Sequence, residues 1–337
     1  MRLEELEQIA RRNRLDAVIV VGQANVRALT GVNCDNAALV LQLAAAKTRA
    51  VFYTDFRYVP MVHRVAPGLK CRDMKGLALS GKRIGYESSM THARFLALRK
   101  KAPRANFVDI AADLLQLRAV KTPDELARIR AAEKLNCEIW REASAQFKAG
   151  MTERDMARVI QKMMIERGEG EAFETIVCVG KNAAECHHEP DGTVWNGKEP
   201  VLVDMGVKLD GVCSDLTRNL VPARASRLYR KVYDLVREAH DAAIAAAKPG
   251  MTAAKLDKVA RDVIRKGGFG KCFGHSLGHG VGFEIHEAPA VSKRDKTVLK
   301  PGMTVTIEPG IYLEDNLGVR IEDLVLITED GCEMLSE

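Results

Sequence analysis

Two aspartates flanking a sharp turn are the first residues in this chain whose spacing could support chemistry. Asp204 interrupts an apolar run over 201–203, and the chain then reaches Asp210-Gly211 and Asp215. Asp-Gly between β-prone segments is the strongest short signal for a hairpin with a two-residue turn, which needs positive φ at both positions. With residues 210 and 211 in the turn, residue 204 faces 217. The two aspartates then lie on one face, roughly 7–8 Å apart at the backbone.

A second acidic pair, Glu308 and Glu322, is symmetric about Asp315, so an odd-length loop centred there would place these two residues opposite each other. Pro309 cannot donate to a strand ladder, so a bulge or edge position is expected after Glu308. Carboxylates that converge on a buried face repel each other and resist desolvation, and multivalent cations relieve both effects. The ordinary alternative, solvated surface carboxylates, conflicts with the apolar runs around Asp204 and Glu308.

Three histidines lie between the two acidic pairs, in the glycine-rich stretch 273–287, at positions 275, 279 and 286. The first two have the i, i+4 spacing of a helical zinc site. However, residue 276 is serine where that motif has glutamate, and the glycines disfavour a helix. We therefore expect a strand or loop that offers one histidine as a metal ligand and the others as polar groups.

The four carboxylates carry four negative charges, which two divalent cations would neutralise, and a neutral His279 adds a nitrogen ligand. Carboxylates with one imidazole suit Mn²⁺, Co²⁺, Fe²⁺ or Zn²⁺ better than Ca²⁺, and a set without thiolates argues against a structural zinc. Two metals roughly 3.5–4 Å apart can activate a water and polarise a carbonyl. The residues therefore predict metal-assisted hydrolysis.

An internal repeat and a strong helix start predict the domain organisation. Residues 148–168 and 248–268 share a Gly-Met-Thr turn, a helix and a closing glycine, and VLVDMG (201–206) is echoed by VTIEPG (305–310). This two-copy period predicts two similar half-domains packed face to face. Thr122 as N-cap, with proline next and Glu125 completing a capping box, predicts a helix to Lys148. We place an N-terminal α/β domain at 1–118 and the repeated domain at 119–337. The elements expected in the first domain are a helix from Leu3, strands over 17–21, 37–43 and 50–53, and a helix over 92–100.

Composition excludes several functional classes. The chain has 337 residues, enough for two domains, with 51 basic and 45 acidic residues and no basic run typical of a nucleic-acid surface. The N-terminus resembles neither a signal peptide nor a membrane span. Eight cysteines without a CxxC pair indicate reduced thiols in a cytoplasmic protein.

These motifs resemble the pita-bread metallopeptidases: methionine aminopeptidase, prolidase and aminopeptidase P. The matching catalytic segments are VDMGVKLDGVCSDLTR (203–218), HSLGHGVGFEIHE (275–287), TIEPGIYL (306–313) and GVRIED (318–323). NVRALTG (25–31), TDFRY (54–58), GYESS (85–89) and LRAVKTPDELARIR (117–130) extend the resemblance to the proline-specific, two-domain branch. It implies an α+β chain: an N-terminal creatinase-like α/β domain followed by a pseudo-twofold pita-bread (α/β sandwich) catalytic domain.

Carried over position by position, the resemblance implies five metal ligands: Asp204 on one metal, His279 and Glu308 on the other, and Asp215 and Glu322 bridging. It also gives Glu308 a proton-relay role. Four further site residues follow from it. His286 would steady the tetrahedral intermediate, His187 would contact the scissile region, and His275 and Arg320 would line the proline side.

The loop before the first hairpin departs from the family pattern. Glu185-Cys186 stands where Leu-Pro is common before His187, and His188 receives no role from the resemblance. Ala28 stands where the branch often has an aromatic residue, which affects no ligand.

The implied function is hydrolysis of the N-terminal Xaa-Pro bond of short proline-containing peptides by a homodimer. The expected cofactors are two divalent cations, Mn²⁺ or Co²⁺ before Zn²⁺ or Fe²⁺. We expect an Xaa-Pro aminopeptidase rather than a dipeptidase, because no basic residue besides Arg320 is placed to hold the proline carboxylate. A metal-free creatinase-type enzyme and a non-catalytic binding protein are the rival hypotheses. Both would have lost ligands, whereas all five are present.

Overall fold

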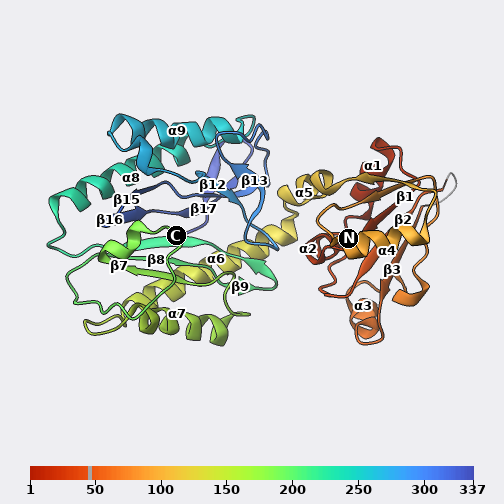
Figure 1. Ribbon diagram of the computed structural model, residues 1–337, viewed down its shortest axis with the longest axis horizontal. Helices are drawn as coiled ribbons and strands as arrows, with labels where there is room; N and C mark the ends of the chain where they lie inside the picture. The colour runs from red at the N-terminus through yellow and green to blue at the C-terminus, as the bar shows by residue number, and fades with distance from the viewer. Residues whose placement is uncertain (45–47) are drawn as a thin grey trace. The chain divides into compact units, whose positions relative to one another are not determined.

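The computed structural model describes residues 1–44 and 48–337, and the chain divides into two units, Met1–Arg118 and Ala119–Glu337 (Figure 1). The first unit is built on a six-stranded sheet in the order β4-β3-β2-β1-β5-β6. Its strands are β1 (Ala17–Val20), β2 (Ala38–Gln42), β3 (Arg49–Thr54), β4 (Lys70–Asp73), β5 (Arg83–Tyr86) and β6 (Asn106–Asp109). Its helices are α1 (Leu3–Arg12), α2 (Gln23–Thr30), α3 (Val59–Val65), α4 (His92–Lys101) and α5 (Ala111–Ala119), with the 3₁₀ turn η1 (Met74–Gly76).

The central position of strand β1 in the sheet explains why its sequence is apolar throughout. Val18 and Val20 pack into one hydrophobic cluster, and Ala17 and Ile19 into a second cluster. A strand covered on both faces is a continuous apolar run rather than an alternating one. The helices and strands expected in this domain are all present, which confirms its α/β class.

The second unit contains two similar halves. The first has α6 (Pro123–Ser144), α7 (Glu153–Arg167), β7 (Ile176–Val179), η2 (Gly180–Ala184), β8 (Val201–Met205), β9 (Lys208–Leu209), β10 (Val212–Cys213) and β11 (Leu216–Leu220). The second has α8 (Arg227–Ala246), α9 (Ala253–Lys266), η3 (Gly270–Cys272), β12 (Gly278–Gly280), β13 (Glu287–Val291), β14 (Thr304–Ile307), β15 (Gly310–Leu313), β16 (Leu317–Arg320), β17 (Asp323–Ile327) and β18 (Cys332–Met334). The larger sheets run β11-β8-β7 and β13-β12-β14-β17-β18.

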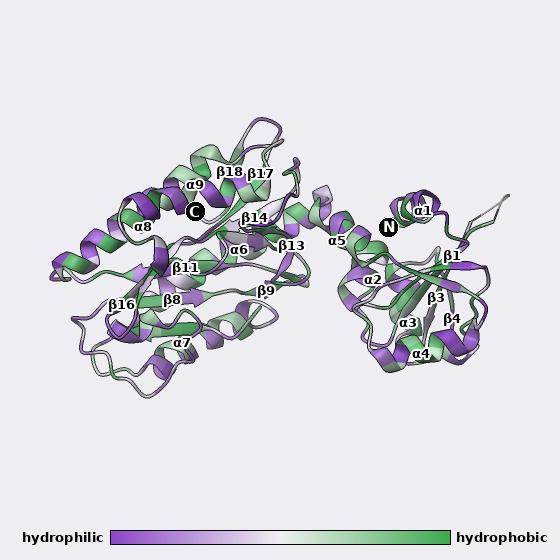
Figure 2. Ribbon diagram, turned by 45° about the horizontal axis from the view of Figure 1, so that its top comes forward, coloured by the Kyte–Doolittle hydropathy of each residue, from purple (hydrophilic) through white to green (hydrophobic). Residues whose placement is uncertain are grey.

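The strands of this unit lie between the helix pair α6 and α7 and the helix pair α8 and α9 (Figure 1). Each pair covers its own apolar cluster. On α8, buried Val232, Val236, Ala239 and Ala243 recur at helical spacing, and Figure 2 shows hydrophilic and hydrophobic bands alternating along this helix. This sandwich confirms the predicted pseudo-twofold pita-bread architecture.

The repeat extends to individual backbone hydrogen bonds. Each second helix begins at a threonine N-cap, Thr152 or Thr252, after a Gly-Met-Thr turn. We call the contacts of this turn with a later segment the capping joint. In the first half, the N–H groups of Gly150, Glu153 and Arg154 donate to the carbonyls of Trp195, Thr193 and Asp191. In the second half, those of Gly250, Ala253 and Ala254 donate to Leu299, Thr297 and Asp295.

The end of α6 differs from the prediction. The Thr122–Glu125 capping box is present, but the helix ends at Ser144 rather than Lys148. The amides of Gln146 and Phe147 bond to carbonyls three residues earlier, which tightens the chain into turns and buries Phe147 in the apolar cluster. No helix in the described part of the chain is long and apolar enough to cross a membrane.

Candidate active site

The hairpin that carries the two aspartates has the predicted register. Asp210 and Gly211 both have positive φ, 48° and 67°. Leu209 pairs with Val212 across the turn, and Asp204 on β8 pairs with Thr217 on β11. Glycine is required at position 206 next to this hairpin, because a Cβ there would lie 2.3 Å from the Ser214 carbonyl oxygen.

The two glutamates also lie opposite each other as predicted. Pairs Ile307–Asp323 and Gly310–Arg320 flank them with the same register, and Asp315 at the loop centre has φ of 55°. β14 ends at Ile307 and β15 begins at Gly310, so the ladder is interrupted at Glu308 and Pro309.

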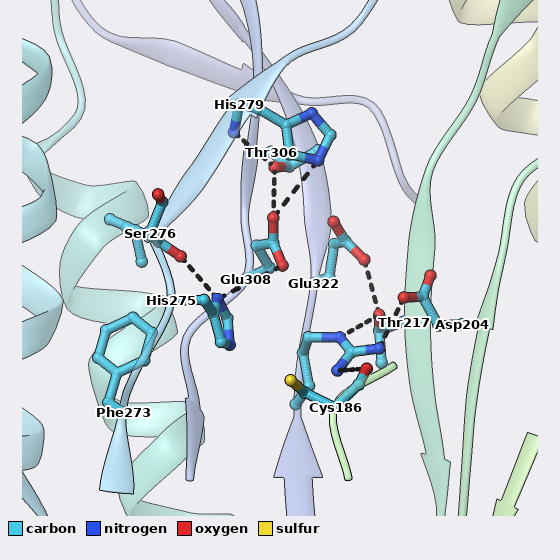
Figure 3. A network of polar contacts seen from close by, with 12 residues as sticks. Cys186, Asp204, Thr217, Phe273, His275, Ser276, His279, Thr306, Glu308 and Glu322 are labelled. Atoms are coloured by element: carbon cyan, nitrogen blue, oxygen red, sulfur yellow. Dashed lines mark hydrogen bonds and ion pairs between the residues drawn. The ribbon is translucent and has the colours of Figure 1, made fainter. Parts of the chain in front are cut away.

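The acidic pairs and His279 meet at one place. His279 Nε2 lies 3.4 Å from Asp215 Oδ2 and 3.4 Å from Glu308 Oε1. One ligand atom each from Asp215, His279 and Glu322 lie within 4.8 Å of one another. Figure 3 shows Glu308 and Glu322 side by side, with His279 above them and Asp204 to the right of Glu322.

Without a counter-ion, this cluster opposes ionisation. Burial, followed by the charge of Glu322, raises the pKa of Asp215 well above its ordinary value. Burial, followed by the charge of Glu308, raises the pKa of Glu322 in the same way. Burial also raises the pKa of Glu308, although Arg320 opposes this shift. These carboxylates cannot all ionise together unless bound cations neutralise their charge.

His279 is prepared to act as a nitrogen ligand. Burial lowers its pKa to about 4, so the ring is neutral near pH 7. Its Nδ1 lies 3.1 Å from the carbonyl oxygen of Gly280, which can only accept a hydrogen bond. Nδ1 therefore carries the proton, and the lone pair of Nε2 faces the carboxylates.

Arg320 connects the predicted ligand Asp204 to the opposite wall. It is buried, and its Nη2 donates to Asp204 Oδ2 at 2.6 Å. Its Nε donates to Thr217 Oγ1 at 3.0 Å and its Nη1 to the Tyr312 hydroxyl at 2.8 Å and the Cys186 carbonyl at 3.4 Å. Most of the guanidinium donors are therefore already engaged within the protein.

His275 continues this network. Its Nδ1 donates to the Ser276 carbonyl at 2.8 Å (Figure 3). The unprotonated Nε2 therefore accepts from the Tyr312 hydroxyl at 3.0 Å. Burial, followed by the charge of Arg320, lowers the pKa of His275 to about 4. The imidazole is therefore neutral and fixed in one tautomer.

All nine residues expected at the site line one cavity of about 1070 Å³. They are His187, Asp204, Asp215, His275, His279, His286, Glu308, Arg320 and Glu322. His187 and His286 are exposed on its wall, and the His286 ring contacts that of His279 edge to face at 4.4 Å between centroids.

The donor set fits divalent cations. Asp204 Oδ1 is buried and has no hydrogen-bond partner among the described residues, although its twin Oδ2 is paired with Arg320. An unpaired buried carboxylate oxygen is costly unless a cation binds it. Oxygen donors with one neutral imidazole match the predicted metals.

Sequence reasoning missed the polar residues that hold the candidate ligands. Thr217 Oγ1 donates to Glu322 Oε2 at 2.6 Å, and its place opposite Asp204 in the hairpin register could have revealed it. Tyr312, which joins Arg320 to His275, lies in the TIEPGIYL segment but received no role from the sequence.

Comparison with known proteins identifies the family. Residues 127–329 match metallopeptidase family M24, and residues 2–120 match the creatinase/prolidase N-terminal domain. The chain belongs to metallopeptidase family M24. The Xaa-Pro dipeptidase of Pyrococcus furiosus is 33% identical over 339 residues, covering 100% of this chain and 97% of that protein.

Solved M24 structures are similar over the whole chain. The prolidase of Pyrococcus horikoshii has a TM-score of 0.94 and 31% identity, covering 100% of this chain and 98% of its own. The X-Pro aminopeptidase of Thermotoga maritima has a TM-score of 0.88 and 31% identity, covering 98% and 97%. This M24 protein is a peptidase, which confirms the expected enzyme class.

Proposed function

We propose that this protein is an Xaa-Pro dipeptidase that uses two divalent cations, Mn²⁺ or Co²⁺. The observation that carries the proposal is the convergence of four buried or half-buried carboxylates and neutral His279 on one wall of a cavity that also exposes His187 and His286. Two bound cations would supply an activated water and a polarised scissile carbonyl.

The protein's own residues would divide the remaining work. Asp204, Asp215, His279, Glu308 and Glu322 hold the cations. Glu308 accepts the proton of the attacking water.

Two exposed histidines would handle the substrate. His286 donates a hydrogen bond to the oxyanion of the tetrahedral intermediate, and His187 contacts the peptide near the scissile bond. An Xaa-Pro bond has no N–H to donate, so its recognition depends on shape around the proline ring. His275 and Arg320 line that side.

The relatives favour the dipeptidase over the aminopeptidase as the proline-specific activity. Several relatives that match this chain nearly end to end are named Xaa-Pro dipeptidase, which favours the alternative over the aminopeptidase expected from sequence. Two observations keep the aminopeptidase as a second candidate. Arg320 has few free donors for a proline carboxylate, and the cavity of about 1070 Å³ exceeds what a dipeptide fills.

Substrate length tests the choice. A dipeptidase should show a far higher kcat/KM on Ala-Pro than on Ala-Pro-Ala in the presence of Mn²⁺ or Co²⁺, and an aminopeptidase should show the reverse. Equal cleavage of Ala-Ala and Ala-Pro would remove the proline assignment. The homodimer expectation rests on the family resemblance alone. The molar mass measured by light scattering after size-exclusion chromatography tests it.

A further inference from the structure

A buried glutamate on α7 anchors a segment of the cavity wall, although it lies outside the proposed metal site. Glu153 has no exposed surface. Its Oε1 accepts hydrogen bonds from the amide of Val179 at 2.6 Å and from Asn182 Nδ2 at 2.9 Å. Its Oε2 accepts from the amide of Asp191 at 3.0 Å and lies 2.8 Å from His188 Nε2. One carboxylate thus holds both ends of residues 179–191, which we call the wall segment.

The internal repeat indicates that this glutamate side chain is not needed to build the helix. Position 153 corresponds to position 253 in the second half, where the residue is alanine. Both residues make the same backbone bond of the capping joint. The amide of Glu153 donates to the Thr193 carbonyl at 3.1 Å, and the amide of Ala253 donates to the Thr297 carbonyl at 2.9 Å. Alanine is sufficient for this joint in the second half, so the joint does not need the Glu153 side chain. The contacts of that side chain are instead with the wall segment.

The wall segment carries His187. Residues 186–190 all line the cavity. On one side of His187 the chain is held by Arg320, whose Nη1 donates to the Cys186 carbonyl at 3.4 Å. On the other side His188 contacts Glu153, and its Nδ1 lies 3.3 Å from Glu185 Oε2. His187 therefore sits between two anchored neighbours.

We propose that the Glu153–His188 pair is a positioning device that fixes His187 against the substrate. The proposal rests on the proposed function, because it assumes that His187 contacts the peptide. Without the pair, the backbone bonds of the capping joint would remain, but the side-chain contact nearest to His187 would be lost. A displacement of about 1 Å at a substrate-positioning group can cost on the order of 10²-fold in rate.

A third cation is the competing explanation, because Glu153, His188 and Asp191 offer ligand atoms within 4.8 Å of one another. The hydrogen bonds argue against it. Both Glu153 oxygens already face two nitrogen partners each, and Asp191 Oδ1 accepts from the Thr193 amide at 2.6 Å. A cation would have to displace these donors.

A double-mutant cycle tests the proposal. His188→Leu should lower kcat/KM on Ala-Pro by about 10- to 100-fold, and His188→Gln, which keeps a donor, should recover part of the loss. The double variant His187→Ala/His188→Leu should be no slower than His187→Ala alone, because His188 acts only through His187. Additive losses would overturn the proposal, as would wild-type kinetics in His188→Leu.

Amide hydrogen exchange gives a readout that does not depend on activity. Glu153→Ala copies the second half of the repeat and should speed exchange at the Val179 and Asp191 amides. Asp155→Asn is the matched control on the same helical turn, since Asp155 bonds to Thr152 and not to the wall segment. If Glu153→Ala does not fold, His188→Leu carries the test.

Two further outcomes distinguish this proposal from a third metal site and from the proposed function. Loss of a bound cation in His188→Leu would identify a metal site and overturn the proposal. If the wild type cleaves no Xaa-Pro bond, the proposed function fails, and hydrogen exchange alone decides whether Glu153 anchors the wall segment.

Discussion

Asp204 has two oxygens in different situations. Oδ2 is held by Arg320 at 2.6 Å, whereas buried Oδ1 has no partner among the residues described. The first contact fixes the direction of the carboxylate, and the second oxygen is the atom that a proposed cation would bind. A single side chain thus joins the proposed ligand set to the buried network of Arg320 and Thr217.

Asp204→Asn should abolish nearly all activity while the protein stays folded. The change keeps the shape of the side chain but removes a ligand charge. We expect a loss of more than about 100-fold, above the range typical of residues that only support a ligand. Elemental analysis should find less bound metal, and circular dichroism should match the wild type. Full turnover with unchanged metal content would show that Asp204 is not a ligand.

His286→Ala should lower kcat far more than it raises KM, since the proposed hydrogen bond strengthens as the oxyanion forms. Loss of one such donor typically costs on the order of 10²–10³ in rate. His286→Phe is the matched control, because it keeps a ring against His279 but has no N–H. Both variants should be impaired alike. An effect on KM alone would assign His286 to substrate binding.

At the scale of elements, most of the structure that the sequence could predict follows from its turns. Asp-Gly at 210–211 and the symmetry about Asp315 predict both hairpin registers, because turn geometry determines which residues face each other. The predicted end of α6 was wrong, because burial of Phe147 overrides a helical pattern. Glu153 could not be predicted as an anchor, since its partners lie 26 to 38 residues away.

Gly318→Ala should destabilise the fold strongly. A Cβ at Gly318 on β16 would lie 1.6 Å from the Ala183 carbonyl oxygen in η2, and a backbone atom cannot move aside cheaply. Overpacking typically costs about 1–3 kcal/mol and occasionally more. Gly331→Ala is the control, because its Cβ would meet nothing within 4 Å. Thermal unfolding of both variants measures the difference, and equal Tm values would contradict the close approach.

His188 should make the wall segment more stable in acid than in base. Burial alone would lower the pKa of His188, but hydrogen bonds to Glu153 and Glu185 outweigh it and raise the pKa above 6.5; Asp191 also faces the ring. A raised folded-state pKa gives stability that is complete below the ordinary value and is lost as pH rises through the folded value. The Tm difference between wild type and His188→Gln should therefore be larger near pH 6 than near pH 9. A constant difference would contradict this linkage.

At the scale of the molecule, the site joins the two halves of the repeat. Asp204 and Asp215 come from the first half, and His279, Glu308 and Glu322 come from the second. Each half has its own apolar cluster, so bound cations would add a connection between two cores. The sequence echo predicts this arrangement because each half places two carboxylates within or directly beside its strands.

Chelation should therefore lower Tm as well as abolish activity. Ligands bound only by the folded state stabilise it by roughly 4 kcal/mol at 1,000 times Kd, or roughly 10 °C for a unit of this size. Activity and Tm should return together at close to two equivalents of Mn²⁺ per chain. Asp204→Asn is the control and should lose less Tm on chelation. Full activity in metal-free protein would contradict the two-metal proposal.

The capping joint has a consequence for how such a chain can diversify. Its backbone bonds recur in both halves although the side chains differ, with Glu153 in one and Ala253 in the other. Backbone bonds place no demand on side-chain identity, so the side chain at position 153 can contact the wall segment without disturbing the joint. The proposed ligands lie outside the wall segment. A substitution at position 153 can therefore change how the wall segment is held while the proposed ligands and the helix start stay in place.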